Sequence, residues 1–141
     1  MWAIPGWRSW PYGAGHGGEG GEAAVNVSGA EFWIVLDELV AACELVIDRP
    51  RSSAHPRYAS AVYPLDYGYL AGTTAADGGG LDVWRGSLPD RRVTAIVCTV
   101  DMIKRDAEIK VLLGCTAEEA EEIAAWHTGG GQAALLVMRP A

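Results

Sequence analysis

Two aspartates, Asp77 and Asp82, flank a run of three glycines in this chain of 141 residues. Carboxylates held at a flexible turn suit a hard cation that prefers oxygen ligands, such as Mg2+. Tyr63, Tyr67 and Tyr69 precede the turn, and a tyrosine hydroxyl can donate a hydrogen bond to a phosphate oxygen. This stretch therefore indicates a site for a metal together with a phosphate compound.

A second acidic set follows later in the chain, at Asp106 and Glu108, with Lys110 close behind. Carboxylates around Mg2+ ions, with Arg, Lys and Tyr side chains to hold phosphate oxygens, are the parts of a metal-assisted phosphoryl hydrolase. A barrel could bring the two acidic sets together in one mouth. The remaining candidate cations are Arg49, Arg51, Arg57 and Lys104.

Three of these cations are arginines of one loop, which spans 49–58 and is rich in turn residues. Arginine forks match phosphate oxygens well, so a phosphate-binding loop is one interpretation. A solvated loop with surface ion pairs is the other, and the sequence leaves both open. For His55 in this loop, the favoured interpretation is a packed or solvent-facing histidine, and a phosphate donor is the alternative.

The overall composition limits the partners that the chain can have. Its net charge of -7 argues against nucleic acid, which needs a basic face for its phosphates. The longest apolar runs are far shorter than the roughly 20 residues of a membrane helix, so we expect no membrane partner. The N-terminus also lacks the pattern of a secretory signal. A small phosphorylated molecule remains compatible, because metal ions can bridge carboxylates to phosphate.

Three cysteines, Cys43, Cys98 and Cys115, are far apart in the sequence and form no CxxC pair. A structural zinc site is therefore not expected. All three lie in apolar surroundings, which suits buried thiols in a reducing compartment. We therefore expect a cytoplasmic protein.

The first 27 residues differ in composition from the rest of the chain. They contain Trp2, Trp7 and Trp10, followed by a glycine-rich run. Such a run cannot recover the entropy lost on ordering, so the sequence predicts a flexible Gly/Trp-rich extension over 1–27. The favoured interpretation is a dispensable extension; docking of the tryptophans on a partner or on the domain is the alternative. A single domain is expected over 28–141.

Apolar spacing and capping patterns predict two helices. Capping-box spacing at Ser28 begins a helix over about 29–42, with Phe32, Leu36, Leu39, Val40 and Cys43 on its inner stripe. A second capping box at Thr116 begins a helix that runs to about 127. Strands are predicted over 45–49, 93–100, 108–113 and 133–139, with another beginning at 81. Several short strands with a helix at each end favour an α+β, mainly β, fold: a small barrel with flanking helices.

At this point the residues resemble a known family. Tyr-Pro-Leu-Asp-Tyr-Gly-Tyr at 63–69, followed by Asp-Gly-Gly-Gly-Leu-Asp-Val at 77–83, resembles the signature of the soluble (family I) inorganic pyrophosphatases. Asp-Ala-Glu-Ile-Lys-Val at 106–111 resembles their second acidic segment, in which an acidic residue lies two before a lysine. The match covers roughly 45–113 and looks like a short, divergent bacterial branch of that family.

The resemblance implies a five-stranded, closed, OB-like barrel with helices packed outside. It also implies Mg2+-dependent hydrolysis of pyrophosphate to two phosphates, with Mn2+ as an alternative metal. The family often forms homo-oligomers, and the sequence permits such an assembly. By resemblance, the metal ligands are Asp77, Asp82, Asp106 and Glu108, the catalytic residues are Asp77, Asp82 and Tyr67, and the phosphate-binding residues are Arg57, Lys110 and Tyr67.

The sequence departs from the family pattern at three places. The middle aspartate of the first signature is Gly79, at a position that contacts the metals and the attacking water in the family. In the second segment, Asp101 and Asp106 keep the family's acidic spacing but place Glu108 where the lysine belongs, whereas alignment on Lys110 leaves Glu108 as the acid. The family's late Tyr-Lys pair is absent, and Arg49, Arg51 or Lys104 would have to replace it.

Three functions remain open from the sequence. The first is an active hydrolase of pyrophosphate or a related small phosphoanhydride, with activity impaired by Gly79. The second is a catalytically inactive pyrophosphatase-like module that binds phosphate compounds or a protein partner. The third is an assembly module that uses the Trp-rich N-terminus.

Overall fold

The computed structural model describes residues 29–141. The predicted flexible extension over 1–27 and the predicted helix cap at Ser28 lie outside the described residues. The first described helix is preceded by Gly29, which offers no side-chain cap. None of the helices in the described part is both long and apolar enough to cross a membrane.

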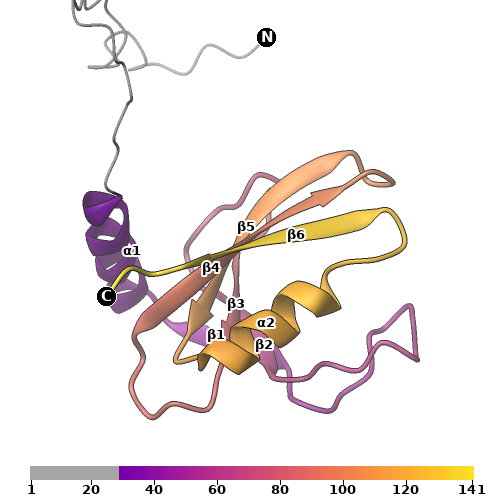
Figure 1. The fold of residues 1–141 in the computed structure, drawn as a ribbon, viewed down its shortest axis with the longest axis horizontal. Helices are drawn as coiled ribbons and strands as arrows, with labels where there is room; N and C mark the ends of the chain where they lie inside the picture. The colour runs from indigo at the N-terminus through magenta and orange to yellow at the C-terminus, as the bar shows by residue number, and fades with distance from the viewer. Residues whose placement is uncertain (1–28) are drawn as a thin grey trace, which may run out of the picture.

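The described residues form two helices and six strands, with five of the strands between the two helices (Figure 1). Both predicted helices are present, and the predicted strands appear at nearly the predicted positions. The strand β2 was not predicted, because its sequence was interpreted as a run leading into the glycine turn. The elements are α1 (Ala30–Ala42), β1 (Leu45–Arg49), β2 (Asp66–Leu70), β3 (Leu81–Arg85), β4 (Val93–Asp101), β5 (Asp106–Leu113), α2 (Ala117–Trp126) and β6 (Gln132–Met138).

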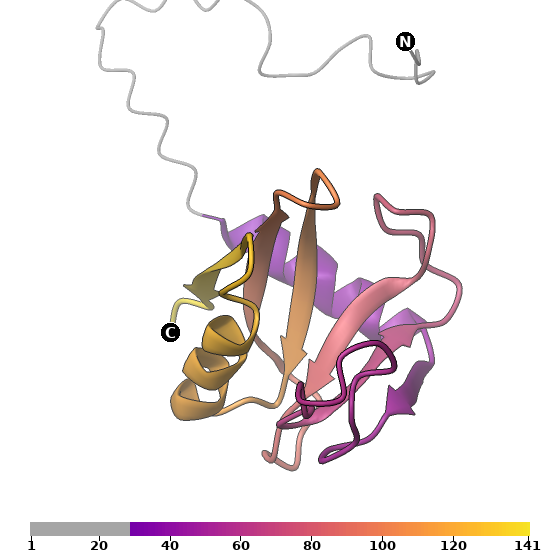
Figure 2. The same ribbon diagram turned by 90° about the vertical axis from the view of Figure 1, so that its right-hand side faces the viewer.

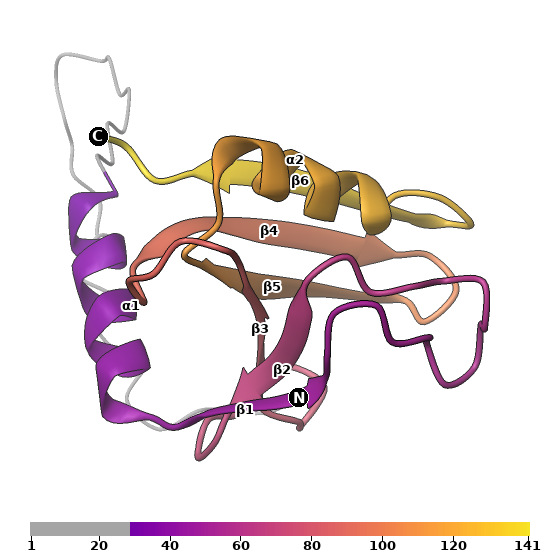
Figure 3. The same ribbon diagram turned by 90° about the horizontal axis from the view of Figure 1, so that it is seen from below.

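The strands form one sheet in the order β1-β2-β3-β5-β4-β6. Neighbours are antiparallel except β3 and β5, which are parallel. The prediction of a five-stranded closed barrel is therefore wrong, because the sheet has six strands and β1 and β6 lie at its two edges. The sheet is strongly curved (Figure 3), but within 29–141 its edges do not pair. Helices, rather than edge-to-edge pairing, cover its apolar faces.

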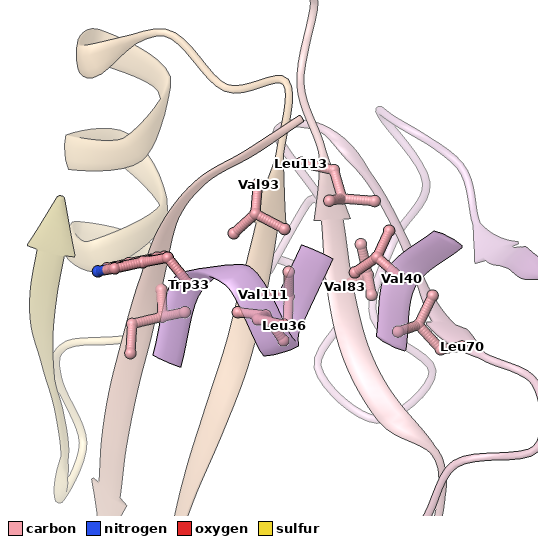
Figure 4. Packing of buried hydrophobic residues seen from close by; sticks show 9 residues of the cluster. Trp33, Leu36, Val40, Leu70, Val83, Val93, Val111 and Leu113 are labelled. Carbon is pink, nitrogen blue, oxygen red and sulfur yellow. The ribbon is translucent and has the colours of Figure 1, made fainter. Parts of the chain in front are cut away.

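The helix α1 covers one face of the sheet. Trp33, Leu36 and Val40 recur at helical spacing and pack on strand residues such as Val83 and Val111 (Figure 4). Burying each such side chain contributes about 1.5–3 kcal/mol. The predicted inner stripe was partly wrong, since Phe32 is 44 % exposed and Leu39 is 38 % exposed. Trp33 faces the core instead of Phe32.

The helix α2 covers the opposite face. Successive strand residues alternate between the two clusters, so that Val83 lies under α1 while Trp84 lies under α2 with Ile123. The predicted capping box is confirmed: Thr116 accepts from the backbone N–H of Glu119, whose side chain accepts from the backbone N–H of Thr116. This cap fixes where α2 begins and therefore where its apolar side meets the sheet.

Strand β2 runs through the middle of the Tyr-Gly-Tyr stretch. A Cβ at Gly68 would collide with the backbone carbonyl of Val46 in β1, so only glycine allows the two strands to approach this closely. Tyr67 and Tyr69, on either side of Gly68, point to the α2 side of the sheet together with their register partners Trp84 and Asp82. The sequence motif is therefore a strand whose alternation delivers its tyrosines to one face.

Candidate active site

The parallel pairing of β3 and β5 places the two acidic loops at the same end of the sheet. The loop over 71–80 precedes β3, and the turn over 102–105 precedes β5, so parallel neighbours bring both loops to one end. Figure 2 shows both loops at that end of the sheet. Both segments that carry acidic residues therefore begin from the same end of the sheet, although the sheet forms no closed barrel.

Lys110 is the centre of a polar cluster on the α2 side of the sheet. Its ammonium donates to Asp82 Oδ2 at 2.7 Å, to Glu108 Oε2 at 3.0 Å and to the Tyr67 hydroxyl at 3.2 Å. An ammonium has three donors, and these three acceptors use all of them. Three strands, β2, β3 and β5, therefore each deliver a side chain to one positive charge.

This cluster is largely withdrawn from water. The side chain of Lys110 is 7 % exposed, that of Glu108 is 14 % exposed and that of Asp82 is 26 % exposed. Burial acts to lower the pKa of Lys110, but Tyr67 and the two carboxylates outweigh it and raise the pKa above its usual range. The lysine is therefore a permanent cation. Burial also raises the pKa of Tyr67, so its phenol stays neutral and remains a donor.

Several aromatic rings pack against Tyr67 beside this cluster. The ring of Tyr67 is 4.6 Å from that of Trp84 and 5.4 Å from that of Tyr63, measured between centroids. Trp126 packs on both Tyr63 and Trp84 from α2. Because aromatic rings exclude water from this side, the charges of the cluster act in a medium of low effective dielectric and interact strongly.

Arg49, in the edge strand β1, lies beside the cluster. It lies opposite Tyr67 in the β1–β2 register, and its guanidinium donates to the Tyr63 hydroxyl at 2.9 Å. Tyr63 was not predicted as a site residue. It precedes β2, so strand alternation could not predict which way its side chain points. The tyrosine motif at 63–69 was the one sequence feature that pointed to it.

The remaining predicted residues lie farther out. Asp77 is exposed in the β2–β3 loop, where its Oδ1 accepts from the backbone N–H of Gly79 at 2.9 Å. Asp106 is half-buried at the start of β5, opposite Asp101. Arg57 and Lys104 are exposed in loops. The structure thus brings Asp82, Glu108, Lys110 and Tyr67 into direct contact, and leaves these four outside that cluster.

Comparisons with known proteins place the fold. No protein-family model matches the chain, and no curated protein matches it. A solved structure of an inorganic pyrophosphatase from Neisseria gonorrhoeae is similar over 67 % of this chain and 80 % of that one, with a TM-score of 0.55 and 17 % identity. The described chain has the fold of an inorganic pyrophosphatase.

Two further solved structures are similar at lower scores. An inorganic phosphatase from Anaplasma phagocytophilum has 14 % identity and a TM-score of 0.48, covering 67 % of this chain and 81 % of that one. An inorganic pyrophosphatase from Coxiella burnetii has 18 % identity and a TM-score of 0.43, covering 65 % of this chain and 81 % of that one. The assignment of the pyrophosphatase fold rests on the Neisseria structure.

The pyrophosphatase fold raises the question of a divalent metal. Among residues 29–141, no group of three or more His, Cys, Asp or Glu side chains is gathered to hold one. Asp82 and Glu108 converge, and both are bound to Lys110. This arrangement does not fit a metal held by the protein alone. It fits Mg2+ that arrives with phosphate oxygens, because Mg2+ typically takes one or two protein carboxylates and completes its shell with phosphate and water.

Proposed function

We propose that this protein hydrolyses pyrophosphate, or a related small phosphoanhydride, to phosphate with the help of Mg2+. One observation carries the proposal: the Lys110 ammonium is held by Asp82, Glu108 and Tyr67 on the half-buried face of a pyrophosphatase fold. A fixed positive charge beside carboxylates and a phenol combines oxyanion binding with metal binding in one place. Mn2+ is the expected substitute for Mg2+.

Each side chain has a distinct role in this proposal. Asp82 and Glu108 would hold the metal, and Asp77 in the loop before β3 and Asp106 at the start of β5 are proposed as further ligands from the same end of the sheet. When bound, the metal neutralises the charge that builds up on the phosphate oxygens. Tyr67 donates its phenol hydrogen to a phosphate oxygen and so positions the substrate.

Lys110 binds phosphate by exchanging one of its three hydrogen-bond acceptors for a phosphate oxygen. All three of its N–H donors are already used, so a phosphate oxygen must take the place of one partner. The bond to the Tyr67 hydroxyl, at 3.2 Å, is the longest of the three and the only one to a neutral group. Arg49 adds a second positive charge beside Tyr67, and Arg57 and Lys104 add charges from the surrounding loops.

A second candidate is a module that binds phosphate compounds without hydrolysing them. The favouring observation is that the carboxylates of Asp82 and Glu108 are already neutralised by Lys110, while Gly79 supplies no third carboxylate. Such a module would keep the affinity of the pocket for phosphate and lose the turnover.

The proposal also covers the location and the partners of the protein. The three cysteines in the described part are free thiols, which supports a reducing, cytoplasmic location. The proposed partners are small phosphate compounds, without nucleic acid or membrane, and a homo-oligomer is compatible with the exposed apolar side chains of α1, such as Ile34 and Val35.

Phosphate release from pyrophosphate with Mg2+ tests the proposal. The wild-type protein should release phosphate, and both Asp82→Asn and Lys110→Met should lower the rate by about a hundred-fold or more, as for loss of a charge-stabilising group in a buried site. Asp90→Asn, in an exposed loop, is the matched carboxylate control and should leave the rate unchanged. Thermal melting of each variant separates lost chemistry from lost folding.

Two other outcomes decide between the candidates. Calorimetric binding of pyrophosphate that Lys110→Met abolishes, without turnover in the wild type, would establish the binding module. Neither binding nor turnover in the folded wild-type protein would rule out both.

A further inference from the structure

The loop between β1 and β2 is a preorganised structure. Its two legs are joined by backbone hydrogen bonds from Ser52 N–H to the Tyr63 carbonyl, from Tyr63 N–H to the Ser53 carbonyl, and from His55 N–H to the Ala61 carbonyl, at 2.8, 2.9 and 2.8 Å. An isolated bridge between Ala54 and Val62 continues the pairing. The position of His55 near the tip is therefore fixed by the backbone.

The orientation of the His55 ring is also fixed. Its Nδ1 accepts from the backbone N–H groups of Arg57 at 3.0 Å and Tyr58 at 3.3 Å. A nitrogen that accepts two hydrogen bonds carries no proton, so the proton of the neutral ring resides on Nε2. The ring lies nearly parallel to that of Tyr63, with 8° between the planes and 6.1 Å between centroids. The loop thus presents an Nε2–H donor of defined direction, which no acceptor among residues 29–141 engages.

Positively charged side chains act on this imidazole. Arg49 donates to the hydroxyl of the same Tyr63 that His55 stacks on, and its guanidinium carbon lies 5.8 Å from the centre of that ring. Arg57 follows two residues after His55. Burial lowers the pKa of His55, and the positive charges of Arg49, Lys104 and Arg57 lower it further. Lys104 belongs to the β4–β5 turn, so charges from two separate loops act on one imidazole.

The neutral imidazole can donate a hydrogen bond to an anion at this place. The positive charges of Arg49, Lys104 and Arg57 act on it together. A phosphate dianion would be attracted by the three cations and would need a directed donor to fix its orientation. An N–H donor that is already aligned binds such an anion without a further loss of side-chain entropy.

We propose that His55, together with Arg49, Arg57 and Lys104, forms a second anion subsite, in which its Nε2–H donates to a phosphoryl oxygen. Tyr63 links the subsite to the Lys110 cluster, since its ring contacts both His55 and Tyr67. The ligand class is a terminal phosphoryl group or inorganic phosphate. The inference goes beyond the proposed function, because an anion can bind at this loop whether or not pyrophosphate is hydrolysed at Lys110.

A pair of substitutions separates the donor from the loop structure. His55→Asn removes Nε2–H but keeps an acceptor for the two backbone N–H groups, because Asn side chains accept such hydrogen bonds in turns. His55→Gln places an amide N–H near the former Nε2 but gives up the Nδ1 acceptor. We expect His55→Asn to melt at the wild-type temperature and to bind inorganic phosphate and methylenediphosphonate about ten-fold or more weakly, as for a lost hydrogen bond to a charged acceptor. His55→Gln should regain part of that affinity.

A matched pair of substitutions tests whether the positive charges contribute to anion binding. Lys104→Gln should weaken binding of both probes, whereas Arg91→Gln should not, because it makes the same change of charge beside Asp37 and Val40 of α1. The NMR signals of the His55 imidazole in the wild-type protein give a direct readout and should shift as inorganic phosphate is added.

The subsite is overturned if His55→Asn binds both probes as tightly as the wild type, or if phosphate leaves the His55 signals unchanged. Binding that depends on His55 in a protein that does not hydrolyse pyrophosphate would support the subsite and contradict hydrolysis. Hydrolysis that His55→Asn leaves unchanged, with unchanged probe binding, would support the proposed function and contradict the subsite.

Discussion

Gly79 occupies the centre of the turn between Asp77 and Asp82, where the resembled family has an aspartate. Its backbone lies outside the left-handed region, and the nearest atom to an added Cβ would be Asp77 Oδ1 at 3.4 Å. A side chain at this position therefore meets little steric resistance. The neighbouring Gly78 differs, because its φ of 88° is a conformation that residues with a side chain rarely adopt.

Gly79→Asp should increase phosphate release from pyrophosphate with Mg2+. The new carboxylate adds a metal ligand in the loop beside Asp77, and we expect a gain of at least about ten-fold, because one group that stabilises charge is commonly worth that much or more. The rate is measured at saturating Mg2+. Gly78→Asp is the control: it adds the same charge one residue away but strains the backbone, so it should lower the melting temperature without a gain in rate. An unchanged or lower rate for Gly79→Asp would contradict the metal-binding role of this turn.

Residue types and spacing predicted part of the candidate site. Glu108 and Lys110 are two residues apart in the predicted strand over 108–113, and strand alternation puts such residues on one face. The structure brings them together with Asp82 and Tyr67. The sequence did not show that the Lys110 ammonium would bind both carboxylates, since this depends on the parallel pairing of β3 with β5. Long-range pairing of this kind leaves no local signal.

At the level of elements, α2 is tied to the sheet by His127. This residue is buried, and its Nε2 accepts from the indole N–H of Trp84 at 3.1 Å. Burial, followed by the charge of Lys110, lowers the pKa of His127 from 6.5 to about 3. The bond is available only while the imidazole is neutral, so the packing of α2 on β3 depends on pH.

The free energy of unfolding should therefore fall as the pH falls from about 6.5 towards 3. The unfolded chain binds a proton at His127 in this range and the folded chain does not, so acid favours unfolding. The contribution of this group is complete above pH 6.5, and its slope approaches about 1.4 kcal/mol per pH unit below that value. Urea denaturation at a series of pH values measures it.

His127→Gln is the matched variant, because its amide oxygen can accept from Trp84 but does not titrate. Its stability should depend less on pH across the same range. An equal slope in wild type and variant would show that other groups cause the acid sensitivity.

The helices and most strands could be predicted because their signals are local. The capping box at Thr116 and the apolar run of β4 each act within a few residues. Two features were not local. β2 is short and contains Gly68, whose fit is decided by the backbone of β1, and closure of the barrel depends on whether β1 meets β6. The prediction failed at both points for this reason.

On the scale of the whole molecule, the chain is acidic, but several of its positively charged side chains belong to one region. The net charge is -7, yet Arg49, Arg57, Lys104 and Lys110 gather around Tyr63 and Tyr67 or the loops beside them. Acidic side chains elsewhere, including those in the first turn of α2, account for the overall charge. Arg49, Arg57 and Lys104 suit the phosphate oxygens of a small anion, whereas the overall negative charge of the chain disfavours a polyanion such as nucleic acid.

Phosphorus NMR of pyrophosphate mixed with the wild-type protein and Mg2+ tests the proposed function most directly, because one sample reports both binding and turnover. We predict that the pyrophosphate signal broadens or shifts on addition of protein and is replaced over time by the signal of inorganic phosphate. Lys110→Met should abolish both changes while the protein remains folded. A pyrophosphate signal that neither shifts nor decays in the presence of folded wild-type protein and Mg2+ would contradict the assignment of this surface as a phosphoanhydride site.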